Sequence, residues 1–235
     1  EFQQERVGEF VALYDSSHTL IVSADGSRTL VIGEGEWPFP IPLALVDDQW
    51  QFDLVAGHEE MLNRRIGRNE LSAMEVCRAI GDAQHDYRAL GPEGKATFAV
   101  RLRSDEGRKN GLFWPVADDE PPSPLGAFAA EASADGYGPD QVEAKAPYHG
   151  YYYRILTKQG PSGPGGAKDY VVNGFLTSGF AVLAWPAEYG ETGVMTFMLD
   201  HRGIVFESDL GEDTLDVVRD LHAFDPDSKW SIVSE

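Results

Sequence analysis

Few residues of this chain stand in a pattern that supports catalysis. His58-Glu59-Glu60 places an imidazole beside two carboxylates, but position 62 is leucine, where a His-Glu-x-x-His zinc site needs its second histidine. The helix dipole is a sufficient reason for carboxylates at the start of a helix. His85 and Asp86 are neighbours on one helix, so they do not face each other, and we expect them on an exposed charged face.

Two further motifs fall short of an active site. Residues 160–166 (GPSGPGG) lack the Lys-Ser/Thr ending of a phosphate loop and lead into a strand, so we expect a flexible loop. No serine stands in a G-x-S-x-G elbow. A triad assembled from distant positions stays open, and with it a hydrolase of unrecognised type.

Two acidic segments offer oxygen ligands for calcium. Asp118 and Asp119 stand in one of them, and Asp225 and Asp227 in the other. Calcium binds carboxylate oxygens, but neither segment has the spacing of an EF-hand loop. Calcium is therefore an alternative with these four candidate ligands, and we expect no other cofactor.

Two groups of side chains are candidates for contact with a partner. Aromatic residues recur in the last third of the chain, and those that do not enter the core could form a partner or glycan surface. A basic group stands apart in an acidic chain; it either pairs within the molecule or docks an acidic neighbour. The candidates are Tyr152, Trp185 and Tyr189 in the aromatic group, and Arg64, Arg65 and Arg68 in the basic group.

The elements that must position these residues begin with a long helix. From about Gly57 to Leu90, apolar or small residues recur every three or four positions, interrupted by the polar Asn69. Gly67 and Gly81 are points where this helix could bend or stop. The stripe of bulky residues predicts a core face, in which Cys77 is inert.

Antiparallel strands are expected on both sides of this helix. Residues 5–14 predict a short helix, and Asp25-Gly26 between β-branched runs predicts a hairpin. Residues 107–148 are rich in Gly, Pro and acidic residues and predict a long surface loop, with one short helix near residues 128–132. Later strands are expected at 151–157, 169–173, 179–185, 194–199 and 204–206, a helix at 215–221, and a last strand near Trp230.

Composition limits the class of partner. The 235 residues carry 39 acidic and 19 basic side chains, a net charge of −20, which repels nucleic acid and anionic lipid. We expect neither of them as a partner, and no segment has the length and apolar character of a membrane span. The single cysteine excludes an internal disulfide. The chain starts at Glu1 without an initiator Met, so the sequence leaves open whether an N-terminal segment was removed by processing or by design.

Several runs resemble an exported family of Gram-negative bacteria that is known only as a domain of unknown function. The runs are WPFPIPL from Trp37, NRRIGRNELSA from Asn63 and GYYYRILT from Gly150. This resemblance implies a periplasmic or secreted protein.

The motif N-E-x-S-A followed by A-Q-x-x-Y on one helix is similar to type IV pilins and pseudopilins. The strand from Gly150, the pair within 184–197 and the hairpin at 200–205 match their sheet. The resemblance implies an α+β fold in which the long helix packs on an antiparallel, pilin-like sheet. Residues 1–56 form a smaller helix-plus-sheet segment, loosely similar to cystatin or NTF2-like domains, and residues 57–235 the second domain.

These features together favour a non-enzymatic protein of the bacterial envelope with a structural or interaction role. The expected partner is another protein or a second copy of the chain. A small-ligand or calcium-binding module is the alternative, and a hydrolase is the second alternative.

Overall fold

The computed structural model describes residues 2–117, 119–128 and 146–234. The chain divides into two compact units, Glu1–Arg65 and Ile66–Glu235. The division falls inside the long helix, some residues after the boundary at 56 where that helix was expected to begin. Each unit is described below by itself.

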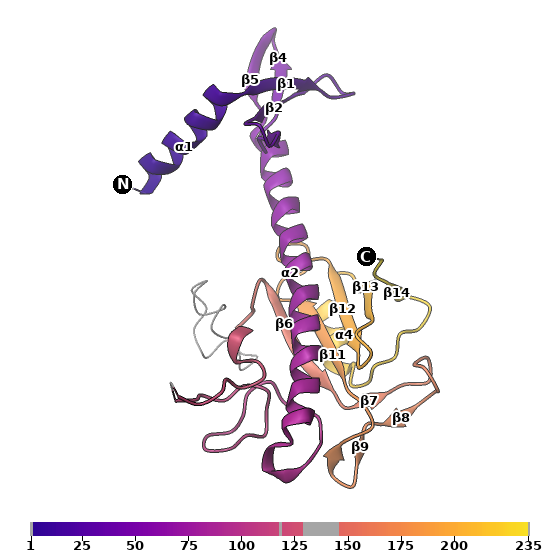
Figure 1. The fold of residues 1–235 in the computed structure, drawn as a ribbon. Coiled ribbons are helices and arrows are strands. Elements are labelled where there is room, and N and C mark those ends of the chain that lie inside the picture. Colours follow the sequence, from indigo (N-terminus) through magenta and orange to yellow (C-terminus); the bar gives the residue numbers. More distant parts are fainter. Residues whose placement is uncertain (1, 118, 129–145, 235) are drawn as a thin grey trace. The chain divides into compact units, whose positions relative to one another are not determined.

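The first unit is a short helix followed by a small antiparallel sheet (Figure 1). The strands stand in the order β1-β2-β4-β5, and β3 pairs with the second side of β2. The predicted hairpin is confirmed: His18 lies opposite Ile32, and the Asp25 carboxylate accepts a 3.0 Å bond from the Ser27 amide in the turn. The elements are α1 (Phe2–Ser16), β1 (His18–Val22), β2 (Arg28–Ile32), β3 (Trp37–Pro38), β4 (Leu43–Val46) and β5 (Gln49–Phe52).

The long helix, α2, spans Leu54–Leu90, which confirms the predicted element. Its start is capped by Asp53, whose Oδ1 accepts the amides of Val55 (3.1 Å) and Ala56 (3.0 Å). It ends at Gly91, whose φ of 57° is left-handed, followed by the 3-10 turn η1 (Pro92–Gly94). Its 37 residues correspond to about 55 Å of helix.

The second unit is built on a five-stranded antiparallel sheet in the order β14-β13-β12-β11-β6. Two small ribbons, β7 with β8 and β9 with β10, extend from it. The predicted hairpin around residues 200–203 joins β12 to β13. The elements are β6 (Tyr151–Leu156), β7 (Lys158–Gln159), β8 (Lys168–Asp169), β9 (Val171–Val172), β10 (Phe175–Leu176), β11 (Ala181–Pro186), β12 (Met195–Asp200), β13 (Val205–Asp209), α4 (Thr214–Asp220) and β14 (Ser231–Ile232).

The core of this unit lies between α2 and one face of the sheet (Figure 1). Tyr151 packs against Phe197 with tilted rings and 5.9 Å between ring centroids, and a Cβ on Gly81 of α2 would stand 3.1 Å from Leu199. The helical side of the core is the predicted stripe, of which six members are buried: Ala73, Val76, Cys77, Ile80, Ala83 and Tyr87. The opposite face of the sheet carries α4, and Arg154 donates to the carbonyls of Val218 in its last turn and of Leu221 directly after it. The architecture is therefore α+β with one long helix, as predicted.

The predicted loop at 107–148 contributes to this core. Leu112, Trp114 and Leu125 are buried, because the segment folds back so that its few large apolar side chains meet the end of α2. The polar and acidic residues between them stay exposed, as in Asp119 and Glu120. Residues 129–145, and with them most of the short helix expected near residues 128–132, lie outside the described residues.

Candidate interaction surface

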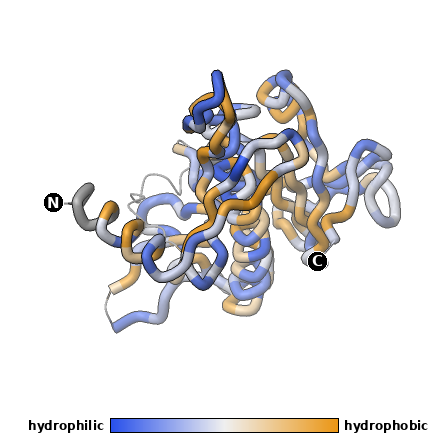
Figure 2. Tube along the Cα trace, turned by 90° about the horizontal axis from the view of Figure 1, so that it is seen from above, coloured by the Kyte–Doolittle hydropathy of each residue, from blue (hydrophilic) through white to orange (hydrophobic). Residues whose placement is uncertain are grey.

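The first unit exposes most of its large apolar side chains. Of the 24 large hydrophobic side chains exposed in the described part of the chain, 15 belong to its first 65 residues. Among the side chains that the structure describes, Val31 and Ile32 are the buried apolar residues of this unit, whereas the second unit buries 29. Figure 2 shows hydrophobic segments on the helix that begins at the N-terminus, where Val7, Val11 and Leu13 are exposed.

What core the first unit has is a small aromatic cluster. Phe39 lies at its centre, 5.5 Å from Phe10 and 5.9 Å from Phe52 between ring centroids. Leu13 packs beside Gly33, where a Cβ would stand 3.1 Å from its side chain. Phe52 is still about half exposed, at 53%. A unit of about this size has marginal folding stability even when its core is filled. Burial of this exposed apolar surface against another surface would therefore stabilise it.

The first strand of the sheet adds an open edge. β1 pairs with β2 on one side, and no strand pairs with its other side among the residues that the structure describes. All five of its side chains are exposed, including Leu20, Ile21 and Val22, and none of them belongs to Asp, Glu, Lys or Arg. Edge strands of natural proteins are ordinarily protected by lysine, proline or a bulge, and β1 has no lysine or proline. β1 therefore presents backbone and apolar groups that another strand can pair with.

The predicted basic group is divided between the two units. Arg64 donates to Glu60 Oε1 (2.7 Å) and to the Pro38 carbonyl (2.8 Å), and its guanidinium lies 5.8 Å from the Trp37 ring. Arg64 therefore ties the start of α2 to β3. Arg65 has contacts of its own, and Arg68 is exposed in the second unit.

The predicted aromatic group lies on the second unit. Tyr152 and Trp185 are half-buried partners across β6 and β11, with 5.8 Å between their rings. Arg154 covers the Trp185 ring at 5.5 Å. Tyr189 donates to Asp209 Oδ1 (3.0 Å), and this bond raises the pKa of the tyrosine. These contacts satisfy the aromatic residues within the unit.

The calcium candidates serve as backbone acceptors or stand apart. Asp225 Oδ1 accepts the Ser162 amide (2.7 Å), and Asp227 Oδ1 accepts the Lys229 amide (2.9 Å). Asp119 is exposed, and Asp118 lies outside the described residues. Within the described ranges no three His, Cys, Asp or Glu side chains are grouped to hold a metal ion.

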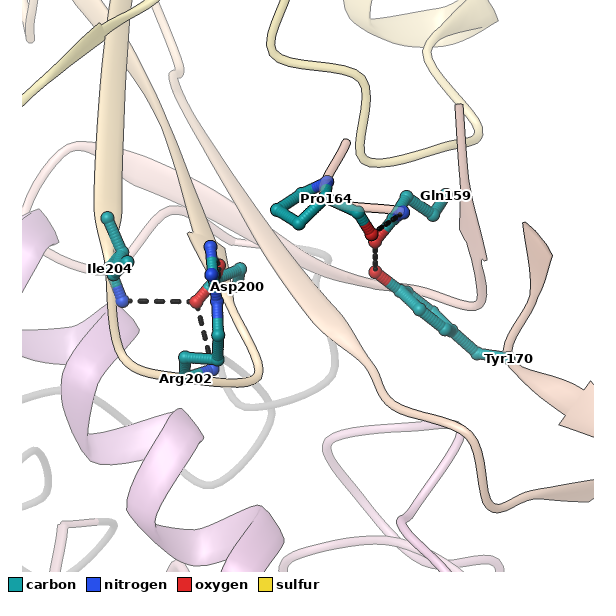
Figure 3. Close-up of polar contacts among 6 residues, drawn as sticks. All are labelled: Gln159, Pro164, Tyr170, Asp200, Arg202 and Ile204. Atoms are coloured by element: carbon teal, nitrogen blue, oxygen red, sulfur yellow. Dashed lines mark hydrogen bonds and ion pairs between the residues drawn. The ribbon is translucent and has the colours of Figure 1, made fainter. Parts of the chain in front are cut away.

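The glycine-rich segment 160–166 is held in place by Gln159. Gln159 Nε2 donates to the carbonyls of Pro164 (2.8 Å) and Gly166 (2.6 Å), and its Oε1 accepts the Tyr170 hydroxyl (Figure 3). This network shapes a strand connection, in which burial raises the pKa of Tyr170 to about 12. It therefore has a structural function.

Three histidines of the described chain, His58, His85 and His201, show no hydrogen bond to a carboxylate. Asp200, next to His201, is buried and accepts the amides of Arg202 and Ile204 together with the Arg202 side chain (Figure 3). His201 Nδ1 is buried without a hydrogen-bond partner, and burial lowers its pKa. His58 is exposed, and His85 lies against the Phe98 and Phe180 rings. Cys77 is fully buried, which raises its pKa to about 12 and leaves the thiol protonated.

The exposed apolar surface of the first unit was not among the residues singled out from the sequence. The sequence of β1 carried a signal for it: Leu20, Ile21 and Val22 follow one another, and no polar residue alternates with them. Which members of such a run are covered depends on neighbours in space, so the sequence pattern alone did not separate it from an ordinary half-buried strand.

Comparisons with known proteins identify one family. The model of a family described as "Protein of unknown function (DUF2950)" matches residues 2–233, almost the whole chain. No curated protein and no solved structure matches. In the described part of the chain, every helix is too short or too polar to cross a membrane.

Proposed function

This chain belongs to the DUF2950 family, and we propose that it is a non-enzymatic interaction protein whose first unit is the docking module. The observation that carries the proposal is the apolar surface of that unit, with 15 exposed large hydrophobic side chains in 65 residues. A large amount of exposed apolar surface indicates a site of association.

Charge makes a protein the better occupant than a membrane. The first 65 residues contain twelve acidic and four basic side chains, a net charge of −8. An anionic lipid surface repels such a unit. The occupant must therefore offer apolar groups without a strong negative charge of its own at the contact.

We take a second copy of the chain as that occupant. β1 has no charged side chain, so two β1 edges can approach each other despite the acidic character of the rest of the unit. Antiparallel pairing of two identical strands is isologous, so the same groups donate and accept on both copies. The pairing would cover Ile21 and its neighbours and remove both open edges at once.

The location proposed for this assembly is the bacterial envelope. Its support is the resemblance to an exported family and to pilins, which also place a long helix on an antiparallel sheet. Cell fractionation tests it, since recovery of the native protein in the cytoplasm alone would contradict an exported role.

The test of the docking module is the oligomeric state of an edge-strand variant. Ile21→Lys places a charge on the exposed side of β1, where the native side chain is 54% exposed. Two lysines brought together across the paired strands should raise the dissociation constant of the dimer about tenfold or more. Sedimentation velocity over a concentration series measures it.

The matched control is Val172→Lys, which changes an exposed strand residue of the second unit. This variant should associate as the unmodified chain does, and both variants should unfold at the same temperature. A chain that stays monomeric at every concentration, or an Ile21→Lys variant that dimerises normally, would show that β1 is not the contact.

A further inference from the structure

A basic cleft lies in the second unit, between the segment 100–109 and the edge strand β6. Its volume is about 1050 Å³, and Trp114, Pro115 and Tyr153–Ile155 complete its wall. Five of the chain's 19 basic side chains line it, against two acidic ones: Arg101, Arg103, Arg108, Lys109 and Arg154 against Asp105 and Glu106. In a chain with a net charge of −20, this is a local excess of positive charge.

The segment that supplies most of these cations has a defined backbone. Phe113 donates its amide to the Leu102 carbonyl (2.8 Å) and accepts from the Ser104 amide (2.8 Å). Ser104 Oγ in turn accepts the Gly111 amide (2.9 Å). A Cβ on Gly111 would stand 2.5 Å from the Arg103 backbone, so the two arms of the loop approach more closely than a larger residue allows. The cations are therefore presented by an ordered loop.

One of the two acidic side chains is engaged within that loop. Asp105 Oδ2 accepts Asn110 Nδ2 (2.7 Å), and its Oδ1 pairs with Arg101. The bond from Asn110, with the nearby arginines, lowers the pKa of Asp105. This carboxylate stabilises the loop, and Arg103 and Arg108 have contacts of their own.

Arg154 is the cation that most needs an anion. It is half-buried on β6, and its Nη2 donates to two neutral carbonyls, Val218 O (2.6 Å) and Leu221 O (2.7 Å). Its Nε is buried with no hydrogen-bond partner, and no described carboxylate forms an ion pair with it. Burial lowers the pKa of this group. An anion nearby would offset that desolvation.

The aromatic wall adds another unused donor. Trp114 Nε1 is buried without a hydrogen-bond partner. The Lys109 ammonium lies 5.4 Å from the ring of Trp114, and no described carboxylate pairs with it. Buried polar groups in folded proteins are nearly always paired, so Trp114 Nε1 and Arg154 Nε are two unpaired donors on residues that line this cleft.

We propose that this cleft binds a small molecule that carries two or more oxyanion groups. Arginine side chains match carboxylate and phosphate oxygens in a planar fork, and the volume suits a ligand larger than a single phosphate. The size of the cleft and the net charge of the chain both disfavour a nucleic acid. The site lies within the second unit and does not depend on self-association.

The test uses tripolyphosphate and citrate as probes in isothermal titration calorimetry at low salt. Lys109→Glu should weaken binding about tenfold or more, because it replaces an attractive contact with a repulsive one. The control, Lys229→Glu, changes the charge of the chain by the same amount at an exposed lysine outside the cleft. It should leave the affinity within about twofold, since distant exposed charges are screened.

The two probes separate the sources of the oxyanion. Binding of tripolyphosphate alone identifies a phosphate-bearing ligand, and binding of citrate alone identifies a carboxylate-bearing one. Binding of both identifies a site that recognises negative charge without selecting the kind of oxyanion. Any of these, with the loss confined to Lys109→Glu, supports the proposal. No binding of either probe, or equal losses in both variants, would overturn it.

Discussion

The polar residue that interrupts the apolar stripe of α2 is a point of attachment between helix and sheet. Asn69 Nδ2 donates to the Thr192 carbonyl (2.8 Å), and Glu70 Oε1 accepts the amides of Val194 (2.9 Å) and Met195 (3.0 Å). Met195 begins β12, so Glu70 pairs backbone donors at the entry to the central part of the sheet. This contact accounts for the Asn-Glu of the N-E-x-S-A motif by structure alone.

Removal of the Glu70 carboxylate should destabilise the second unit. Glu70→Ala leaves two half-buried amides without an acceptor, at a cost of about 1–3 kcal/mol in the free energy of unfolding. Glu70→Gln keeps one acceptor oxygen and should lose less. Urea denaturation measures both, with Glu75→Ala, an exposed position on the same helix, as the control. If Glu70→Ala lowers the free energy of unfolding no more than Glu75→Ala does, the hydrogen bonds of Glu70 do not contribute to stability.

At the scale of the element, α2 is continuous where its sequence suggested a break. Gly67 and Gly81 both lie inside the uninterrupted helix Leu54–Leu90. They differ in surroundings: nothing lies within 4 Å of a Cβ on Gly67, whereas a Cβ on Gly81 would stand 3.1 Å from Leu199 Cδ2. Gly81 therefore permits close packing of helix on sheet, and Gly67 has no such contact.

The two glycines should respond differently to alanine. Gly67→Ala should raise the free energy of unfolding by about 0.5–1 kcal/mol, because alanine has the higher helix propensity and reduces the entropy of the unfolded chain. Gly81→Ala gains the same propensity but crowds Leu199, so it should be neutral or destabilising. Thermal unfolding followed by circular dichroism compares them. Equal gains would mean that the sheet does not constrain Gly81.

At the scale of the whole molecule, the two units differ in how much apolar surface each of them buries by itself. The second buries 29 apolar residues in one cluster, and the first buries two. Hydrophobic burial is the main stabilising term in folding, so the first unit has the greater need of an external surface. This difference in burial is consistent with the proposal that the first unit is the part that associates.

Self-association of an acidic chain should strengthen with added salt. Each copy carries a net charge of −20, and the repulsion between copies is screened as the Debye length falls from about 20 Å to about 6 Å between roughly 20 and 300 mM salt. Sedimentation velocity at both salt concentrations should show a larger dimer fraction in the second. A dimer that weakens with salt would indicate attraction between opposite charges, which contradicts pairing through the uncharged β1.

The sequence by itself determined the elements whose signals are local. The periodicity of α2, the Asp25-Gly26 turn and the hairpin at residues 200–203 were predicted within a few residues, because each depends on neighbours in the chain. The separation of Tyr151 and Tyr153 from Tyr152 likewise follows from strand alternation. The α+β class was therefore available from the sequence.

Only the tertiary structure decided which apolar residues are covered and which polar groups meet. Glu70 and Met195 are 125 positions apart, and no periodicity indicates that they share a hydrogen bond. Trp114 is buried and Trp37 exposed, although both stand in short apolar runs, because burial depends on what the rest of the chain brings against them. The basic cleft, likewise, exists because β6 brings Arg154 beside the loop that carries Arg101 and Lys109.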